Sequence, residues 1–294
     1  MRRAAIGPAV LAVGLSLVAP PALSAEPAQV ERGLYMLRAA GCTTCHTDEK
    51  GGGQPLAGGR ALKTPFGTYY SPNITPDPQT GIGGWSNEMF LDALKRGRAP
   101  DGSHYFPVFP YTTYARLSDE DGLAIKAYLD SLEPVRQANR EHDVPPPFSW
   151  RWTMTFWKWL FFEPGEWPGD SSRSADWNRG GYLVEAAAHC GECHTPRNAM
   201  GALERDMHMA GTADGPDGEV VPNITPHEGT GIGSWSQGDI VALLRDGLKP
   251  NFDDVQGSMA EAIEDGLRHL REEDLQAIAV YLKALPPIEH KVAR

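Results

Sequence analysis

Apolar residues at helical spacing close each half of this 294-residue chain. Residues 123–132 place their apolar side chains on one face of a predicted helix, and residues 275–285 repeat that pattern. Ser118, ahead of three acidic residues, predicts where the first helix begins, and Pro286-Pro287 predicts where the second ends. Between the helical segments the chain is rich in Gly, Pro, Asn and Thr, and strand patterns are sparse. We therefore expect an all-α protein with long irregular loops.

Several short segments occur twice along the chain, in the same order. They are Arg-Gly-x-Tyr at 32–35 and 179–182, Pro-Asn-Ile-Thr-Pro at 72–76 and 222–226, and Thr-Gly-Ile-Gly at 80–83 and 230–233. The offset between such copies stays between 147 and 153 residues. A repeat of this length predicts duplicated domains, which we place at residues 26–138 and 177–294.

The segment between the repeats, residues 139–176, is a predicted linker rich in proline and aromatic residues. Its run from Trp150 to Phe162 is interrupted by Arg151 and Lys158. Aromatic side chains bury large areas, so one interpretation is that the linker packs across both domains and fixes their spacing. The other is that it forms a docking surface for a partner or for the membrane interface.

Residues 1–25 have the three parts of a secretory signal peptide. Arg2 and Arg3 are followed by an apolar stretch from 4 to 18 and small residues from 20 to 25. We expect an exported, periplasmic protein that is soluble or peripheral to the inner membrane. An uncleaved anchor is the alternative, although the apolar stretch is shorter than the roughly 20 residues of a spanning helix.

The chain is acidic, with a formal net charge of −11 at pH 7. Loss of Arg2 and Arg3 with the leader would bring that charge near −13. Nucleic acid is therefore not an expected partner. A protein partner with a basic docking surface is one interpretation, and simple solubility is the other.

All four cysteines lie in two Cys-x-x-Cys-His motifs, at 42–46 and 190–194. No thiol is left over for a structural disulfide, although an oxidising compartment favours disulfides. On a helical turn this spacing directs both sulfurs to one porphyrin edge, and the histidine that follows lies beneath the iron. We predict two covalently bound haem c groups, attached at Cys42, Cys45, Cys190 and Cys193, with His46 and His194 as proximal iron ligands. A thiol redox site or a zinc site fits less well, because each motif has its own histidine and heads a separate repeat.

The sixth iron ligand is predicted to differ between the halves. Met259 is the candidate in the second half, ahead of Met207 and Met209, with core packing as the alternative. The matching segment of the first half, residues 105–110, contains no methionine. There His104 is the nearest strong ligand, and an open or water-bound iron is the alternative. Weaker candidates are Tyr111, Tyr114 and Lys95, whereas Met36 and Met89 fall on predicted helices.

Other polar residues recur near the motifs. Asn73, Asn223, Trp85, Trp235 and Arg197 are expected to contact the haem propionates or to organise turns and core. The remaining histidines of the second half have no partner pattern, which predicts surface positions for His189, His208, His227, His269 and His290.

Residues 177–185, leading into 190–198, resemble the second haem motif of the multihaem cytochrome c subunits of membrane-bound alcohol, gluconate, fructose and sorbitol dehydrogenases. Residues 73–76, 80–85 and 101–104 resemble the first domain of those subunits. The resemblance implies two tandem, class I-like cytochrome c domains without catalytic activity of their own. It implies electron transfer from a periplasmic or membrane-bound dehydrogenase to another cytochrome or a terminal oxidase.

The chain departs from that family in two respects. Such subunits usually carry three haems, whereas this sequence has two motifs, and they have methionine where Phe109 stands. His/Met ligation is therefore implied for His194 with Met259, and not for His46. The second departure keeps a rival function open, in which an open first iron makes the protein a haem enzyme or a small-ligand sensor.

Overall fold

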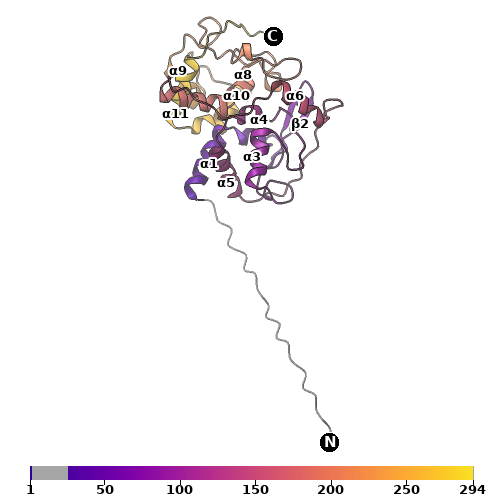
Figure 1. Ribbon diagram of the computed structural model, residues 1–294. Coiled ribbons are helices and arrows are strands. Elements are labelled where there is room, and N and C mark those ends of the chain that lie inside the picture. Colours follow the sequence, from indigo (N-terminus) through magenta and orange to yellow (C-terminus); the bar gives the residue numbers. More distant parts are fainter. Residues whose placement is uncertain (2–25, 294) are drawn as a thin grey trace.

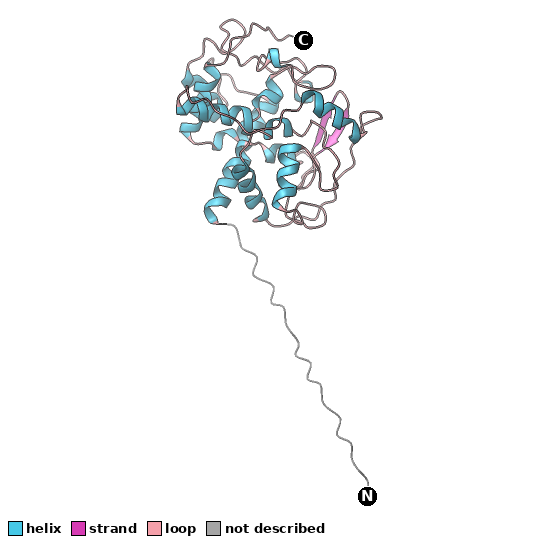
Figure 2. Cartoon of the chain, viewed as in Figure 1, coloured by secondary structure: helices cyan, strands magenta, loops and turns pink. Residues whose placement is uncertain are grey.

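The computed structural model describes Met1 and residues 26–293, so the expected signal peptide lies, except for Met1, outside the described residues. The chain is mostly helical, with one small sheet (Figures 1 and 2). None of the helices in the described part is long and apolar enough to cross a membrane.

The helices of the two halves follow each other in matching order. The first half contains α1 (Pro27–Ala39), α2 (Cys42–His46), α3 (Asn87–Arg96), α4 (Tyr111–Tyr114) and α5 (Asp119–Asp130). The second half contains α7 (Ala175–Tyr182), α8 (Cys190–His194), α9 (Gln237–Asp246), α10 (Gly257–Asp265) and α11 (Glu272–Lys283). Between them the linker forms α6 (Met154–Phe161).

Each half is built on the crossing of its first and last helices, and a glycine of the repeated Arg-Gly-x-Tyr segment lies at that crossing. A Cβ on Gly33 would lie 1.9 Å from the carbonyl oxygen of Ala124, and one on Gly180 would lie 1.9 Å from that of Ala277. Any larger residue would force the helices apart. Ser118 caps α5 as predicted, because its side chain accepts a hydrogen bond from the Asp121 backbone N–H.

The expectation of an all-α fold missed one element. β1 (Ala61–Thr64) and β2 (Gly67–Tyr70) form an antiparallel hairpin in which Ala61 pairs with Tyr70. Two strands of four residues are too short to show a clear alternation in sequence. Tyr69 of β2 packs on Phe106 and Val144, so the hairpin receives its stability from tertiary packing.

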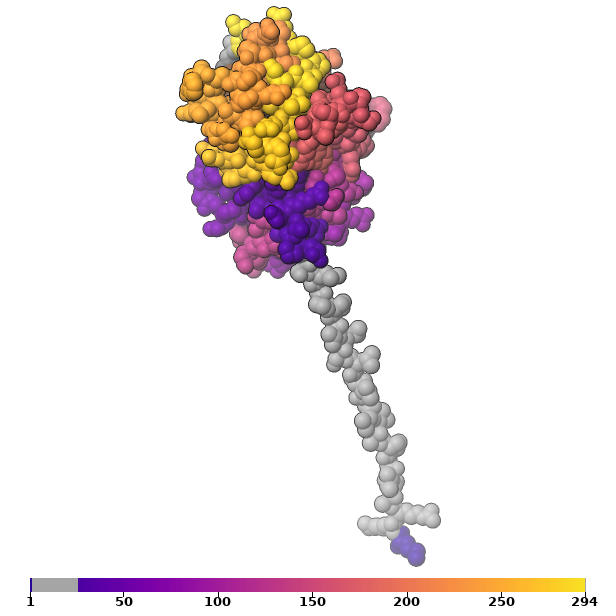
Figure 3. All heavy atoms as spheres, turned by 90° about the vertical axis from the view of Figure 1, so that its left-hand side faces the viewer, coloured from indigo at the N-terminus to yellow at the C-terminus, as the bar shows by residue number. Residues whose placement is uncertain are grey.

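The two halves share one hydrophobic core, which includes Leu37 and Leu129 of the first half and Leu183 and Leu282 of the second. Their close contact is visible in Figure 3, where the orange and yellow second half lies directly against the indigo first half. The halves are therefore not two separate globules on a flexible tether.

The Arg-Gly-x-Tyr segments also join the halves through two matching hydrogen-bond clusters. In one cluster the Arg179 guanidinium donates to Asp274 at 2.7 and 2.8 Å, and Tyr35 of the other half donates to the same carboxylate. In the other, Tyr182 and the Nε–H of Arg32 donate to Asp121, while the second Arg32 donor goes to Glu120. Both carboxylates are buried, with 3% of each residue exposed. Each half thus supplies a tyrosine to the buried aspartate of the other.

The linker combines both interpretations of its sequence. Trp157 of α6 is buried and packs with Tyr111 of the first half and Ala202 of the second, while its indole N–H donates to the Met200 carbonyl at 2.9 Å. The opposite side of the segment is open, with Trp152, Phe156 and Trp159 exposed by 61, 63 and 83%. The linker therefore holds the halves together and also presents an aromatic surface.

Candidate haem-binding sites

The two motif helices hold their histidines in the same way. The imidazole Nδ1–H of His46 donates to the Pro72 carbonyl at 2.8 Å, and that of His194 donates to the Pro222 carbonyl at 2.8 Å. This leaves the Nε2 lone pair for a metal. Burial lowers the pKa of both imidazoles, so both are neutral at pH 7, as an iron ligand must be.

The cysteines of the motifs suit covalent attachment better than thiol chemistry. All four are unpaired in the structure. Burial raises the pKa of Cys42 and of Cys190 to about 12, and that of Cys193 to about 11. Redox-active thiols have lowered pKa values, so these environments do not fit a thiol–disulfide site. Nor do three His, Cys, Asp or Glu side chains gather as potential metal ligands within the described part of the chain.

In the second half, one loop contacts both sides of the proposed iron site. The Pro222 carbonyl orients His194, and three residues earlier the Glu219 carboxylate accepts the backbone N–H of Ser258 at 3.0 Å. That N–H belongs to the first turn of α10, where a carboxylate is favoured. Met259, the next residue, is partly buried and packs against the core.

In the first half, the corresponding distal segment is aromatic. The Phe109 ring lies 5.8 Å from that of Tyr105 and 5.9 Å from that of Tyr114, measured between centroids. Tyr114 donates to the Ala40 carbonyl at 2.6 Å, two residues before Cys42. Phe109 therefore packs beside the first motif where a methionine would otherwise be expected.

His104, the tentative ligand in the first half, contacts the linker. Its Nδ1 lies 3.0 Å from Lys158 Nζ, and its Nε2 lies 3.2 Å from Thr155 Oγ1. To ligate iron it would have to release one of these contacts. Of the weaker candidates, Lys95 pairs with Asp119 and Glu166, whereas Tyr111, Tyr114, Met36 and Met209 are buried and Met89 is exposed.

The two motifs also contact the distal helices of the opposite halves. Thr44, the residue before the second cysteine of the first motif, donates to Asp265 of α10 at 2.9 Å. Glu192, at the same place in the second motif, accepts from Thr112 and Thr113 of α4. Each attachment helix is thereby tied to the opposite half of the molecule. Sequence analysis missed them because Thr44 and Glu192 occupy the variable positions of the motif.

His189 corrects the expectation of a surface histidine. It precedes the second motif and lies between the halves, with its ring centroid 5.6 Å from that of Tyr114. A Cβ on Gly41, which precedes the first motif, would lie 3.6 Å from His189 Nε2. His208 is also paired, to Glu185 at 2.8 Å. Neither pairing is visible in sequence because the partners lie on other segments.

The asparagines organise turns. Asn73 accepts two hydrogen bonds from Thr75 and donates to the Val135 carbonyl at 2.7 Å. Asn223 repeats this pattern with Thr225 and the Ile288 carbonyl. Each therefore ties its loop to the segment after the last helix of its half, which explains why the repeat preserves Asn-Ile-Thr.

These sites define a c-type cytochrome, and comparisons with known proteins agree. The cytochrome c family model matches residues 30–133. A "Diheme cytochrome c-type" protein of Cereibacter sphaeroides is 41% identical over 265 residues, which cover 89% of this chain and 87% of that protein. The cytochrome c subunit of the quinone-dependent alcohol dehydrogenase of Gluconobacter oxydans is 39% identical, and the fructose dehydrogenase cytochrome subunit of Gluconobacter japonicus is 41% identical.

The alignments with the two dehydrogenase subunits cover 94 and 91% of this chain but only 59 and 54% of theirs. The chain therefore spans little more than half the length of those relatives, and most of the dihaem one. It belongs to the cytochrome c family, alongside dihaem cytochromes and the cytochrome subunits of dehydrogenases, and it carries a covalent haem c at each of its two motifs.

Proposed function

We propose that this protein is a periplasmic dihaem electron carrier with two tandem, class I-like cytochrome c domains, which accepts electrons from a dehydrogenase and passes them to another cytochrome or a terminal oxidase. The division at residues 138/139 and 176/177 and the export signal are parts of this proposal. Its main support is the pair of matched histidine sites, whose attachment helices are each tied to the opposite half within one shared core.

Haem c, when bound, supplies a reversible one-electron couple. The chain contributes its position and its surroundings. His46 and His194 are held as neutral ligands by backbone carbonyls, so neither depends on a side chain that titrates. The contacts of Thr44 and Glu192 across the halves fix the two attachment helices relative to each other. A fixed separation favours transfer between the two sites without any movement of the chain.

The two sites are proposed to be unequal. In the second, Met259 would hold the iron together with His194, and His/Met ligation would raise the reduction potential. In the first, Phe109 stands in the matching segment and packs on Tyr114, and His104 is engaged by the linker. This one observation favours a second function, binding of a small neutral ligand such as carbon monoxide or nitric oxide at the first site.

The donor is proposed to dock on the aromatic surface of the linker, formed by Trp152, Phe156 and Trp159. Contiguous exposed aromatic groups mark protein interaction sites, and aromatic residues are enriched in interface cores. The relatives named for alcohol, fructose and gluconate dehydrogenases make such an enzyme the proposed donor. The net charge of −11 favours a basic contact surface on the partner.

The test is reduction of the purified, oxidised protein by periplasmic and membrane fractions of the producing organism, supplied with ethanol, fructose or gluconate. We expect substrate-dependent reduction of both haems. A Trp159→Ser variant should slow the reduction of the haems about tenfold or more and leave the visible spectrum unchanged. The reason is that a central aromatic contact contributes roughly 1.4 kcal/mol or more to binding. Exposed Met200→Ser, outside the aromatic surface, is the matched control. No reduction with any substrate would contradict the proposed function.

A further inference from the structure

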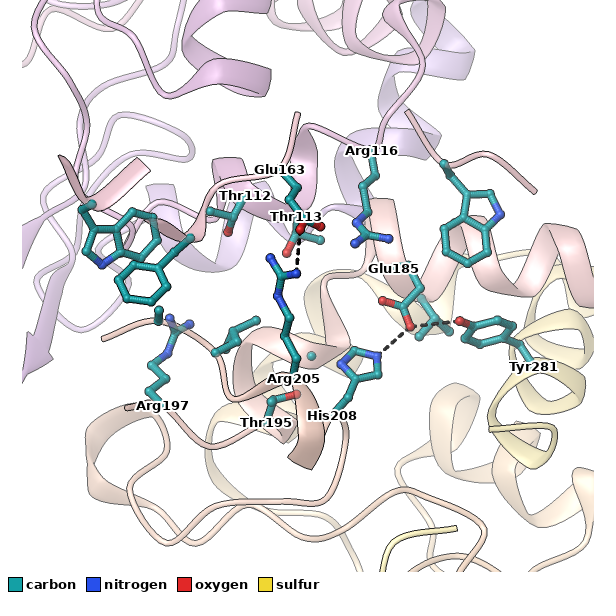
Figure 4. A pocket seen from close by; sticks show the side chains of 17 residues that line it. Thr112, Thr113, Arg116, Glu163, Glu185, Thr195, Arg197, Arg205, His208 and Tyr281 are labelled. Carbon is teal, nitrogen blue, oxygen red and sulfur yellow. Dashed lines mark hydrogen bonds and ion pairs between the residues drawn. The ribbon is translucent and has the colours of Figure 1, made fainter. Parts of the chain in front are cut away.

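A cavity of about 430 Å³ lies behind the second motif, between the two halves and under the linker. Figure 4 shows its side chains converging from α4, the linker, the start of the second half and the loop after α8. None of the described residues that line it is an attaching cysteine or a proposed iron ligand. Gly191 and Thr195 border the cavity, so it adjoins the second motif, and its volume lies within the usual range of small-molecule sites.

The lining is cationic although the chain as a whole is acidic. Arg116, Arg197 and Arg205 contribute guanidinium groups, and His208 adds an imidazole, against the carboxylates of Glu163 and Glu185. The apolar part of the wall comes from Trp157, Phe161, Trp167, Val184, Ala202 and Leu203. The cavity thus combines positive charge with flat aromatic surfaces.

Both carboxylates in the lining are already paired. Glu185 accepts from His208 at 2.8 Å and from Tyr281 at 3.0 Å, and Glu163 pairs with Arg205 at 2.6 Å. Arg197 is likewise taken, by Glu192 and by the Gly201 carbonyl. These pairs leave one cation of the lining without a hydrogen-bond partner, although the charge of the nearby Glu185 carboxylate acts on it.

That cation is Arg116. Within residues 26–293 its partly buried guanidinium has no hydrogen-bond or ion-pair partner, and in Figure 4 it extends toward Glu185 and His208. The indole Nε1–H of Trp167, which also lines the cavity, is buried without a partner in the same part of the chain. Buried donors are nearly always paired, so the Trp167 N–H, in the same cavity as a guanidinium without a hydrogen-bond partner, indicates an acceptor that completes the site.

We propose that this cavity binds a small organic carboxylate with a flat apolar body. A guanidinium fork matches a carboxylate in two parallel hydrogen bonds, and Arg116 supplies it. Trp167 supplies a further donor, and the rings of Trp157 and Phe161 face the body of the ligand. A compact inorganic anion would leave most of the 430 Å³ unfilled.

The duplication argues that the cavity is not a by-product of the fold. The position that matches Arg116 in the second half is His269, whose Nε2 lies 3.1 Å from the Glu264 carbonyl. The position that matches Glu185 in the first half is Arg38, and three further lining residues, Trp157, Phe161 and Trp167, come from the linker, which is not part of the repeat. Arg116 and Glu185 therefore have no counterparts at the matching positions of the other half.

Calorimetric titration of the purified dihaem protein with benzoate tests the proposal, with benzamide as a neutral ligand of the same shape. We expect one benzoate site per chain and at least about tenfold weaker binding of benzamide, since the neutral amide cannot form a charge-assisted pair with the Arg116 guanidinium. Arg116→Gln should weaken benzoate binding about tenfold or more, and Trp167→Phe should weaken it several-fold. The exposed variant Arg245→Gln is the control and should bind as the parent does.

The haem spectrum and thermal midpoint of each variant establish that it is folded. If Arg116→Gln fails to fold, Arg116→Lys retains the charge without the fork, and we still expect weaker binding. The proposal is overturned if benzoate does not bind at millimolar concentrations, if benzamide binds equally well, or if the folded Arg116 variant binds benzoate as the parent does. Binding of inorganic phosphate in place of benzoate would also overturn it.

Discussion

Single residues decide how alike the two haem sites are. The cysteines and histidines of both motifs could be predicted from spacing alone, because covalent attachment requires that order of residues. The orientation of His46 and His194 could not, since the carbonyls of Pro72 and Pro222 lie 26 and 28 residues further along the chain. The distal iron ligands are harder still to predict from sequence. The two sites differ there by single residues, a methionine in the second half and a phenylalanine in the first.

Met259→Ala should change the ligation of one haem only. Loss of the thioether removes the ligand that raises the reduction potential. We therefore expect the midpoint potential of one of the two redox transitions to fall and half of the haem spectrum to change. Redox titration followed by absorption measures both. Met200→Ala, at an exposed methionine in a loop, is the control, and identical behaviour of the two variants would show that Met259 is a core residue only.

At the scale of elements, helix ends followed from local chemistry, while the contacts between halves did not. Ser118 predicted the start of α5, and the apolar spacing of residues 123–132 and 275–285 predicted matching closing helices. That the tyrosine of each copy would reach the aspartate of the other half required the fold, since Tyr35 and Asp274 are 239 residues apart. The hairpin of residues 61–70 was missed because its strands are stabilised by packing on Phe106.

The crossed tyrosines predict a loss of stability when either hydroxyl is removed. Tyr35→Phe and Tyr182→Phe should each lower the free energy of unfolding by about 1–3 kcal/mol, because a buried carboxylate loses a donor. Burial raises the pKa of Tyr182 to about 12, so this donor stays protonated across the neutral range. Denaturant titration measures the loss. Tyr128→Phe is the control, and equal stability of all three variants would contradict the account.

The buried carboxylate of Asp274 predicts acid sensitivity. Burial alone would raise its pKa, but hydrogen bonds from Arg179 and Tyr35 outweigh burial and hold the pKa of Asp274 below its ordinary 3.8. A lowered folded-state pKa gives stability that is present above about pH 3.8 and is lost as pH falls through the folded value. The stability difference between the parent and Asp274→Asn should therefore be constant from about pH 5 to 7 and shrink at lower pH. A difference that does not shrink in acid would show that the aspartate acts by packing alone.

At the scale of the whole molecule, a duplicated unit has become two unequal halves. The repeat predicted two similar domains, and their shared core, one cluster that includes Leu129 and Leu282, makes them a single body. The linker adds a second asymmetry, because Trp157 is buried between the halves while Trp159 faces outward. The sequence was compatible with a linker that packs across the halves and with one that is exposed for docking. It could not show which linker residues are buried and which are exposed, because that depends on which face of α6 meets the core.

The central claim is that two covalent haems differ at their sixth ligand, and carbon monoxide titration of the fully reduced protein tests it most directly. The account predicts one carbon monoxide per chain, bound at the first haem, and none in a Phe109→Met variant that restores a ligand there. His104→Ala should leave the stoichiometry unchanged, because that histidine contacts Lys158 and Thr155. Uptake of no carbon monoxide, or of two per chain, would contradict the account.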